Sequence, residues 1–257
     1  ISRFFKAKFA QEKIEQETPK YFKEQIIKGN IYKGPVLEWY CRVKIGLENY
    51  YEPFHALLPR SGKFYDLGCG YGFMTYMLHW ASEDRLFIGV DYDGDKIITA
   101  QHNYLREKVK KLYLRKQKGA DESEITNLNL QAKINFEQAD VTQYALQPCN
   151  GIIISDVLHY LLPQQQVDLL NKCHDALLPD GMLILRDGVE ELQERHEGTK
   201  RTEVLSTKVF SFNKTQNELH FLSRAFIEKW AAEKGLSVEV LDLTKKTSNL
   251  IFVLRKK

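Results

Sequence analysis

A glycine-rich segment, DLGCGYG, is the first feature of the sequence that could do chemistry. Gly68, Gly70 and Gly72 stand in five residues between a strand-like run and a helix-like one. Because glycine has no Cβ, the backbone of such a turn can bring its amide groups against a bound molecule. The spacing is G-x-G-x-G, and Phe73 stands where the dinucleotide-binding pattern G-x-G-x-x-G requires glycine. The segment therefore predicts close contact between the backbone and a nucleotide-like ligand.

Four aspartates, Asp66, Asp91, Asp140 and Asp156, fall at the ends of consecutive predicted strands. The carboxyl ends of parallel strands meet at one edge of a sheet, so we expect these side chains around one crevice. Asp91 could accept hydrogen bonds from ribose hydroxyls, and Asp140 from an adenine amino group. Carboxylates suit a ligand with an amine and a sulfonium better than one with a pyrophosphate. Each aspartate alone could be a loop or N-cap residue, so the prediction depends on their joint placement.

The elements that must position these residues alternate between strand-like and helix-like patterns from about residue 63 onward. This order predicts an α/β fold with a parallel sheet and helices on both faces. The last two predicted strands are joined only by the short segment TKKTSN, which favours an antiparallel hairpin because parallel neighbours need a long crossover. The expected strands are 63–67, 86–90, 134–141, 151–156, 182–188, 236–243 and 249–256, and the expected helices are 73–80, 97–104, 163–177 and 223–234.

Length and composition narrow the class of protein. A chain of 257 residues with 43% hydrophobic residues can bury a sizeable core, and its formal charge of +3 gives no electrostatic argument for a nucleic-acid partner. No apolar run is long enough to span a bilayer. The four cysteines lack C-x-x-C spacing, so we expect neither a metal site nor a disulfide framework, and we expect a reducing cytoplasm.

Five segments, DLGCGYG, GVDYD, EQADV, ISDVLHYL and LLPDGMLILRDG, resemble the ordered motifs of the class I methyltransferases that use S-adenosylmethionine. The resemblance covers residues 62–254. It implies a Rossmann-like, doubly wound seven-stranded sheet with an antiparallel last strand, S-adenosylmethionine as cofactor and S-adenosylhomocysteine as product. It also implies a cofactor site in which the glycines face the methionyl part, Asp66 lies near its amino group, Asp91 holds the ribose, and Asp140 and Val141 meet the adenine. The remaining residues predicted to bind the cofactor are Cys69, Tyr92 and Asp156.

A narrower resemblance involves the segments KGPVLEWYCRVKIGLENYYEPFHALLP and FNKTQNELHFLS. They are similar to the methyltransferase portion of bacterial multifunctional proteins that also carry lysophospholipid-acyltransferase-like and exporter-like regions. The resemblance implies a lipid-like or aryl-polyene-like methyl acceptor and fusion to, or docking on, an acyltransferase-like domain. The chain begins at Ile1 rather than Met, so we expect it to be a domain of a longer protein.

The acceptor side of the predicted crevice contains candidate bases and binding residues. His159, just beyond the fourth predicted strand, could remove a proton from a hydroxyl or phenolic acceptor, or it could be scaffold near the cofactor, and the same holds for Tyr160. His196 and His220 are further candidates for the base. A charged cluster after the fifth predicted strand could bind an anionic acceptor or be a solvated helix face, and it comprises Arg186, Asp187, Glu190, Arg195, His196, Lys200 and Arg201.

Residues 1–60 are expected to form an aromatic-rich helical extension before the core of residues 61–257, and residues 188–222 an acceptor-side insertion. Leu37, Tyr40, Leu47, Tyr51 and Phe54 follow helical spacing, with Trp39, Arg42 and Lys44 on other faces. The extension could pack on the sheet or act as a lid over the crevice, and its amphipathic start could dock on another domain or a membrane surface. The residues predicted to contact the acceptor are Tyr32, Trp39, Tyr40, Tyr160, Arg186 and His196.

The sequence predicts a methyltransferase acting on oxygen or carbon of a small or lipid-like molecule. A nucleobase amine is disfavoured as acceptor, because SDVLHY stands where an Asn-Pro-Pro-Tyr type of signature would be. Two alternatives stay open. One is a nicotinamide oxidoreductase, against which Phe73 and the terminal hairpin argue, and the other is a module that binds the cofactor without performing chemistry.

Overall fold

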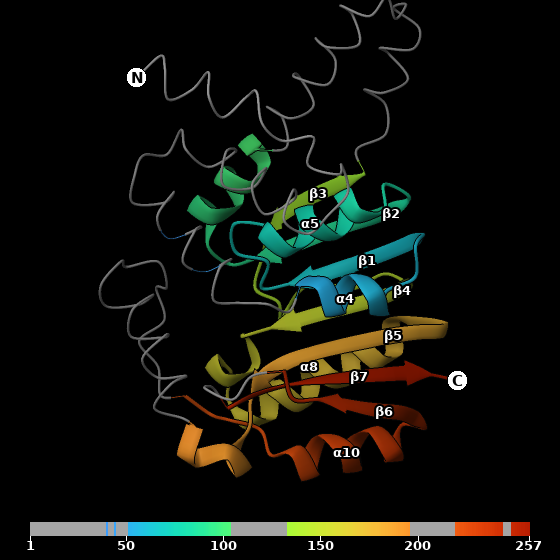
Figure 1. The fold of residues 1–257 in the computed structure, drawn as a ribbon. Helices are drawn as coiled ribbons and strands as arrows, with labels where there is room; N and C mark the ends of the chain where they lie inside the picture. The colour runs from blue at the N-terminus through green and yellow to red at the C-terminus, as the bar shows by residue number, and fades with distance from the viewer. Residues whose placement is uncertain (1–39, 41–43, 45–50, 104–132, 196–218, 244–247) are drawn as a thin grey trace, which may run out of the picture.

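Seven strands form one mixed sheet in the order β3-β2-β1-β4-β5-β7-β6 (Figure 1). The structure is a computed structural model, and it describes residues 40, 44, 51–103, 133–195, 219–243 and 248–257. The sheet order reverses at β1, which pairs with β2 on one side and with β4 on the other, so a crevice is expected outside the carboxyl ends of these strands. The strands are β1 (Gly62–Leu67), β2 (Arg85–Asp91), β3 (Ile134–Gln138), β4 (Cys149–Ser155), β5 (Leu177–Gly188), β6 (Leu236–Leu241) and β7 (Asn249–Lys256).

Strand β7 alone runs against the others, and this confirms the predicted antiparallel hairpin. It is antiparallel both to β6 and to β5, whereas β1 to β5 pair in parallel. Only residues 242–248 connect β6 to β7, which is too short for a crossover. The reversal places Asn249, the first residue of β7, beside Gly188 at the carboxyl edge of the parallel strands.

Helices cover both faces of the sheet, as the prediction of a doubly wound fold requires (Figure 1). Phe64 and Ile153 belong to a buried cluster shared with α4 and α5, and the alternate residues Tyr65 and Ile154 to one shared with α8 and α10. The strand sequences are almost continuously apolar because helices bury both faces of the sheet. Among the described residues, no helix is long and apolar enough to cross a membrane. The helices with both ends described are α4 (Tyr51–Leu57), α5 (Phe73–Ala81), α8 (Pro163–Ala176) and α10 (Arg224–Glu233), with 3₁₀ turns η2 (Leu158–Tyr160) and η3 (Glu190–Arg195). Residues 94–103 are also helical and overlap the helix expected at 97–104.

Strand β5 begins earlier than predicted. The sequence PDG suggests a turn before a strand at residue 182, but β5 starts at Leu177 and is irregular over this segment. Its pairing with β4 jumps from Leu177 to Met182, and Asp180 has a φ of 61°, so the predicted turn is accommodated as a bulge within the strand. Strand β5 ends at Gly188, as expected, so Arg186 and Asp187 lie inside the strand and not after it with the rest of the charged cluster.

A buried arginine attaches helix α4 to the amino edge of the sheet. Arg85, the first residue of β2, has no exposed surface. Its guanidinium donates to the carbonyl oxygens of His55, Leu58, Pro59 and Leu78 at 2.7–3.1 Å. The carbonyls of His55 and Leu78 belong to the last turns of α4 and α5, and those of Leu58 and Pro59 to the turn into β1, where backbone acceptors lack a helical partner. One side chain therefore satisfies several of them at once.

Candidate active site

The three glycines of the loop are needed for different structural reasons. All have positive φ, at 78° for Gly68, 54° for Gly70 and 73° for Gly72, which disfavours any side chain. A Cβ on Gly68 would lie 2.1 Å from a methyl of Val157, and one on Gly72 would lie 2.6 Å from the ring of Phe136. These two glycines are required by packing within the protein. For Gly68 and Gly72, packing is therefore a reason for glycine in addition to the predicted contact with a ligand.

Gly70 is the glycine that faces open space. A Cβ there would meet nothing closer than Cδ of Lys96 at 4.0 Å. Its amide donates to Oδ2 of Asp91 at 2.8 Å, and the amide of Asp93 donates to Oδ1 at 2.9 Å. Asp91 ends β2 and is buried, so its carboxylate ties the glycine loop to the start of the following helical residues. Each oxygen keeps a lone pair that can accept a further hydrogen bond from a ligand.

Replacing Asp91 with alanine is expected to weaken cofactor binding by about 1–3 kcal/mol. Two backbone amides lose their acceptor, and so do the ribose hydroxyls that the sequence predicts to bind there. Titration calorimetry with S-adenosylhomocysteine measures this directly. Asp84→Ala is the matched control, since Asp84 is exposed at the opposite edge of the sheet. Equal affinities of the wild type and Asp91→Ala would contradict the assignment.

Asp66 is a buried carboxyl near the end of β1, 3% exposed. Burial raises its pKa from 3.8 to about 6, a hydrogen bond from the Thr75 hydroxyl at 2.5 Å opposes the rise, and the charge of Asp91 adds to it. The folded protein therefore favours the protonated form more than the unfolded chain does. A cationic ligand would favour the ionised form instead.

We expect the affinity for S-adenosylmethionine to fall by about tenfold per pH unit as the pH drops below about 6, where Asp66 becomes protonated in the free protein. Above that pH the carboxylate is already ionised and the affinity levels off. Calorimetry at about pH 5 and about pH 7, in buffers of different ionisation enthalpy, should show proton release only at the lower pH. Asp66→Asn should bind more weakly at neutral pH and lose this pH dependence, and a wild-type affinity that does not change with pH refutes the prediction.

The residues predicted to hold the adenine lie around the ends of β2 and β3. Asp140 is exposed and lies two residues beyond β3, not at its end as predicted. Its Oδ1 accepts from the amide and the hydroxyl of Thr142, both at 2.8 Å, so this aspartate also caps a local turn. Val141 is buried, and Tyr92 is 47% exposed next to Asp91.

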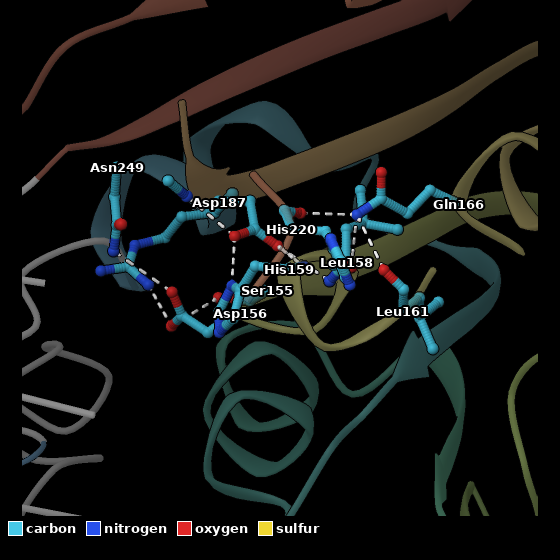
Figure 2. A network of polar contacts seen from close by, with 11 residues as sticks. Ser155, Asp156, Leu158, His159, Leu161, Gln166, Asp187, His220 and Asn249 are labelled. Atoms are coloured by element: carbon cyan, nitrogen blue, oxygen red, sulfur yellow. Dashed lines mark hydrogen bonds and ion pairs between the residues drawn. The ribbon is translucent and has the colours of Figure 1, made fainter. Parts of the chain in front are cut away.

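Asp156 is paired within the protein. It follows β4 with a φ of 56° and forms an ion pair with Arg186. Nδ2 of Asn249 donates to its other oxygen at 3.2 Å (Figure 2). Burial would raise the pKa of Asp156, but the charges of Arg186, Lys44 and His159 outweigh this and hold it below its usual value. Arg186 thus already has a carboxylate partner, which the prediction of an acceptor-binding role did not include.

His159 and Asp187 form a buried pair between the ends of β4 and β5 (Figure 2). Nδ1 of His159 is hydrogen-bonded to Oδ1 of Asp187, and the two residues are 2% and 4% exposed. The carboxylate also accepts from the amide of Leu158 at 2.8 Å and from that of Gly188 at 2.8 Å. Backbone amides therefore hold Asp187 in place, and Asp187 orients the imidazole. With the proton on Nδ1, Nε2 is the basic nitrogen.

The end of the predicted insertion is attached next to His159. The amide of His220 donates to the His159 carbonyl at 2.9 Å, and buried Gln166 donates to the carbonyls of Leu158 and His220 at 2.8 and 2.7 Å (Figure 2). The rings of Tyr160 and Phe221 lie 4.2 and 5.7 Å from the imidazole. Aromatic surface therefore surrounds the His159 side chain.

The described part of the amino-terminal layer reaches the glycine loop. The ring of Tyr40 packs edge-on against that of Tyr71, with centroids 6.0 Å apart. The charge of Lys44, four residues after Tyr40, contributes to the lowered pKa of Asp156. Three residues predicted to contact the acceptor lie outside the described residues, namely Tyr32, Trp39 and His196.

Two site residues were not singled out from the sequence. Lys96 is buried beside the glycine loop, with Nζ 6.0 Å from the Tyr71 ring centre. Burial lowers its pKa, against the opposing charges of Asp91 and Asp93. Asn249 is the other. The predicted antiparallel hairpin was a usable signal for Asn249, because it places the first residue of the last strand at the carboxyl edge.

The sheet order and the loop that opens at Gly70 are those of a class I methyltransferase, a class that uses S-adenosylmethionine. A family model described as "CheR methyltransferase, SAM binding domain" matches residues 60–209, more than half of the chain. The chain belongs to this family, whose description specifies a domain that binds S-adenosylmethionine. The residues present fit that cofactor, because the space at Gly70 is bordered by buried carboxylates suited to a cationic ligand.

Two curated relatives of the chain are carboxy-S-adenosyl-L-methionine synthases. The chain is 29% identical over 125 residues to carboxy-S-adenosyl-L-methionine synthase of Pseudomonas aeruginosa (strain UCBPP-PA14), covering 48% of this chain and 44% of that protein. It is 23% identical over 133 residues to the synthase of Campylobacter concisus (strain 13826), covering 52% and 47%. The chain thus spans less than half the length of these curated relatives.

Solved structures share the fold. The pyocyanin biosynthetic protein PhzM superposes with a TM-score of 0.59 at 15% identity, covering 90% of this chain and 62% of that one. Magnesium protoporphyrin IX methyltransferase (ChlM) from Synechocystis PCC 6803, with bound S-adenosylhomocysteine, gives a TM-score of 0.55 at 16% identity, covering 94% and 96%. At these identities the likeness shows the fold.

Proposed function

We propose that this protein is a methyltransferase that uses S-adenosylmethionine and transfers a methyl group to a hydroxyl oxygen of a small, lipid-like or aryl-polyene-like molecule. The buried pair of His159 and Asp187 carries this proposal. A hydroxyl is a poor nucleophile until its proton is removed, and a histidine oriented by a carboxylate is a suitable base. Carbon acceptors with a phenolic ring could use the same base, but oxygen needs it most directly.

In the proposed reaction, Nε2 of His159 takes the proton of the acceptor hydroxyl. Asp187 keeps Nδ1 protonated and stabilises the imidazolium that forms. When bound, S-adenosylmethionine supplies a methyl group activated by its sulfonium and leaves as S-adenosylhomocysteine. The chain otherwise aligns the acceptor and excludes water, and the burial of His159 supports that role.

The cofactor contacts in this proposal follow the strand ends. Gly70 gives the methionyl part room, with Gly68, Cys69 and Gly72 shaping the loop. Asp66 faces the cationic amine, and Asp91 accepts from the ribose. Asp140 and Val141 meet the adenine, with Tyr92 beside them. Asp156, already paired with Arg186, acts through that pair at the boundary between cofactor and acceptor.

The proposed acceptor pocket has an aromatic wall. Tyr160 and Phe221 flank His159, and Tyr40 packs on Tyr71 of the glycine loop. This wall suits an apolar or aryl acceptor. It supports the roles proposed for residues 1–60 as a lid over the crevice and for the insertion at about 188–222 as part of the acceptor pocket.

Transfer from ¹³C-methyl-labelled S-adenosylmethionine into small-molecule extracts of the source cell tests the proposal. The expected product carries a label whose NMR shift is that of a methoxy group. A labelled N-methyl, C-methyl or S-methyl product would exclude oxygen as the acceptor atom. If the protein binds S-adenosylhomocysteine but no extract fraction gains label, the module that binds without chemistry is favoured instead.

A further inference from the structure

Asn249 is a buried polar residue on the acceptor side of the site. It begins β7, pairs in register with Gly188 of β5, and is 7% exposed. Its Nδ2 donates to Oδ1 of Asp156 at 3.2 Å, and Asp156 in turn pairs with Arg186 (Figure 2). The amide is therefore held next to the pair of His159 and Asp187, one strand away from Asp187.

The carbonyl oxygen of this amide is buried and has no hydrogen-bond partner among the described residues. Exchanging the amide nitrogen and oxygen would place two acceptors against each other, so the carboxylate of Asp156 determines the orientation. A buried acceptor without a donor is unfavourable, and in native structures such an atom usually indicates a water or a ligand. A hydrogen-bond donor for Oδ1 of Asn249 must therefore come from a group other than Asp156 and Arg186.

The position of Asn249 separates it from the predicted cofactor crevice. Strand β7 is two strands from β4 and three from β1, which corresponds to about 10 and 14 Å at the usual strand spacing. A ligand bound at the ends of β1 and β2 does not extend over β7 without crossing the site of His159. A ligand group that reaches Asn249 would therefore come from the acceptor side of the site.

We propose that Oδ1 of Asn249 binds a hydrogen-bond donor, a hydroxyl or an amine, on the part of the methyl acceptor remote from the methylated atom. This inference rests on the proposed function, since it assigns a second polar group to the acceptor of that reaction. Asn249 then selects acceptors by this group, and an analogue in which it is capped leaves a buried oxygen unpaired.

Ligand-observed NMR on the protein saturated with S-adenosylhomocysteine tests the proposal without turnover. The probes are catechol, resorcinol and hydroquinone, each compared with its dimethyl ether, which keeps the ring but has no donor. The wild type should bind at least one diphenol more tightly than its ether. Asn249→Leu should reduce the ratio of the ether's Kd to the diphenol's Kd by about tenfold. Asn135→Leu, at an exposed position of the edge strand β3, is the matched control and should keep the wild-type ratio of the two affinities. Equal ratios in the wild type and Asn249→Leu, or no diphenol preference in the wild type, overturn the proposal.

A crystal structure of the wild-type complex soaked with the preferred diphenol tests the proposal without any variant, so it does not depend on whether Asn249→Leu folds. A hydroxyl within hydrogen-bond distance of Asn249 Oδ1 supports the inference. An ordered water there in soaked and unsoaked crystals, with the diphenol elsewhere, overturns it. The proposed function fails separately, by the absence of a labelled methoxy product, so the two failures are distinguishable.

Discussion

Replacing His159 with glutamine is expected to lower kcat for the methyl acceptor by about 10²–10⁴-fold, the usual contribution of a general base. Glutamine keeps a polar side chain beside Asp187 but cannot take a proton at neutral pH. The affinity for S-adenosylhomocysteine should stay within about twofold, because the imidazole is hydrogen-bonded to Asp187 of β5 and not to the aspartates of β1 and β2 that are predicted to hold the cofactor. Initial rates of label transfer and calorimetry measure the two quantities on the same preparations.

A control for this substitution exists on the surface of helix α8. His174 lies 3.0 Å from Asp175 in a histidine–aspartate pair that solvent reaches, so His174→Gln should leave kcat unchanged. Asp187→Asn tests the orientation of the base. An amide there can donate to Nδ1 and favour the wrong tautomer of His159, so kcat should again fall. A variant of His159 that loses stability but retains the wild-type rate per folded molecule would show that the histidine is structural.

Replacing Arg85 with methionine is expected to lower the free energy of unfolding by about 3–5 kcal/mol. Methionine fills much of the space but leaves the carbonyls of His55, Leu58, Pro59 and Leu78 without their donor. Each buried acceptor that loses its partner costs about 1–3 kcal/mol, and relief from burying the guanidinium offsets part of the sum. Urea unfolding followed by circular dichroism gives the difference.

Arg224 on helix α10 provides the comparison for Arg85. Its guanidinium pairs with Glu228 at 2.7 Å, and the side chain is 51% exposed. Arg224→Met should therefore change the free energy of unfolding by no more than about 0.5 kcal/mol. If Arg85→Met and Arg224→Met are equally stable, the hydrogen bonds of Arg85 do not hold α4 to the sheet.

Several elements were predictable because their signals are local. Strand β7 was expected over the residues it occupies, 249–256, since its apolar run is bounded by polar residues. Helix α10 begins one residue after Ser223, whose side chain accepts from the amide of Phe226 as an N-cap. The predicted start of strand β5 was wrong. Pro179 and Gly181 signal a turn, and only the pairing with β4 shows that this turn lies within the strand.

The candidate site was less predictable than the fold. Asp91 was assigned from its place after an apolar run, and its hydrogen bond to Gly70 agrees with a role at the glycine loop. Asp156 also follows a strand, yet its partners Arg186 and Asn249 come from distant segments. The position of an aspartate at a strand end predicts which edge of the sheet it occupies, but not which charged group pairs with it.

The sequence by itself determined the succession of strands and helices, the direction of the last strand and the edge of the sheet that bears the site. These follow from hydrophobic periodicity, connection length and glycine position, all of which act within a few neighbouring residues. Only the tertiary structure decided that His159 meets Asp187, 28 residues away, and that Asn249 meets Asp156, 93 residues away. A hydrogen bond requires its atoms at about 3 Å, and packing between strands from distant parts of the chain sets such distances.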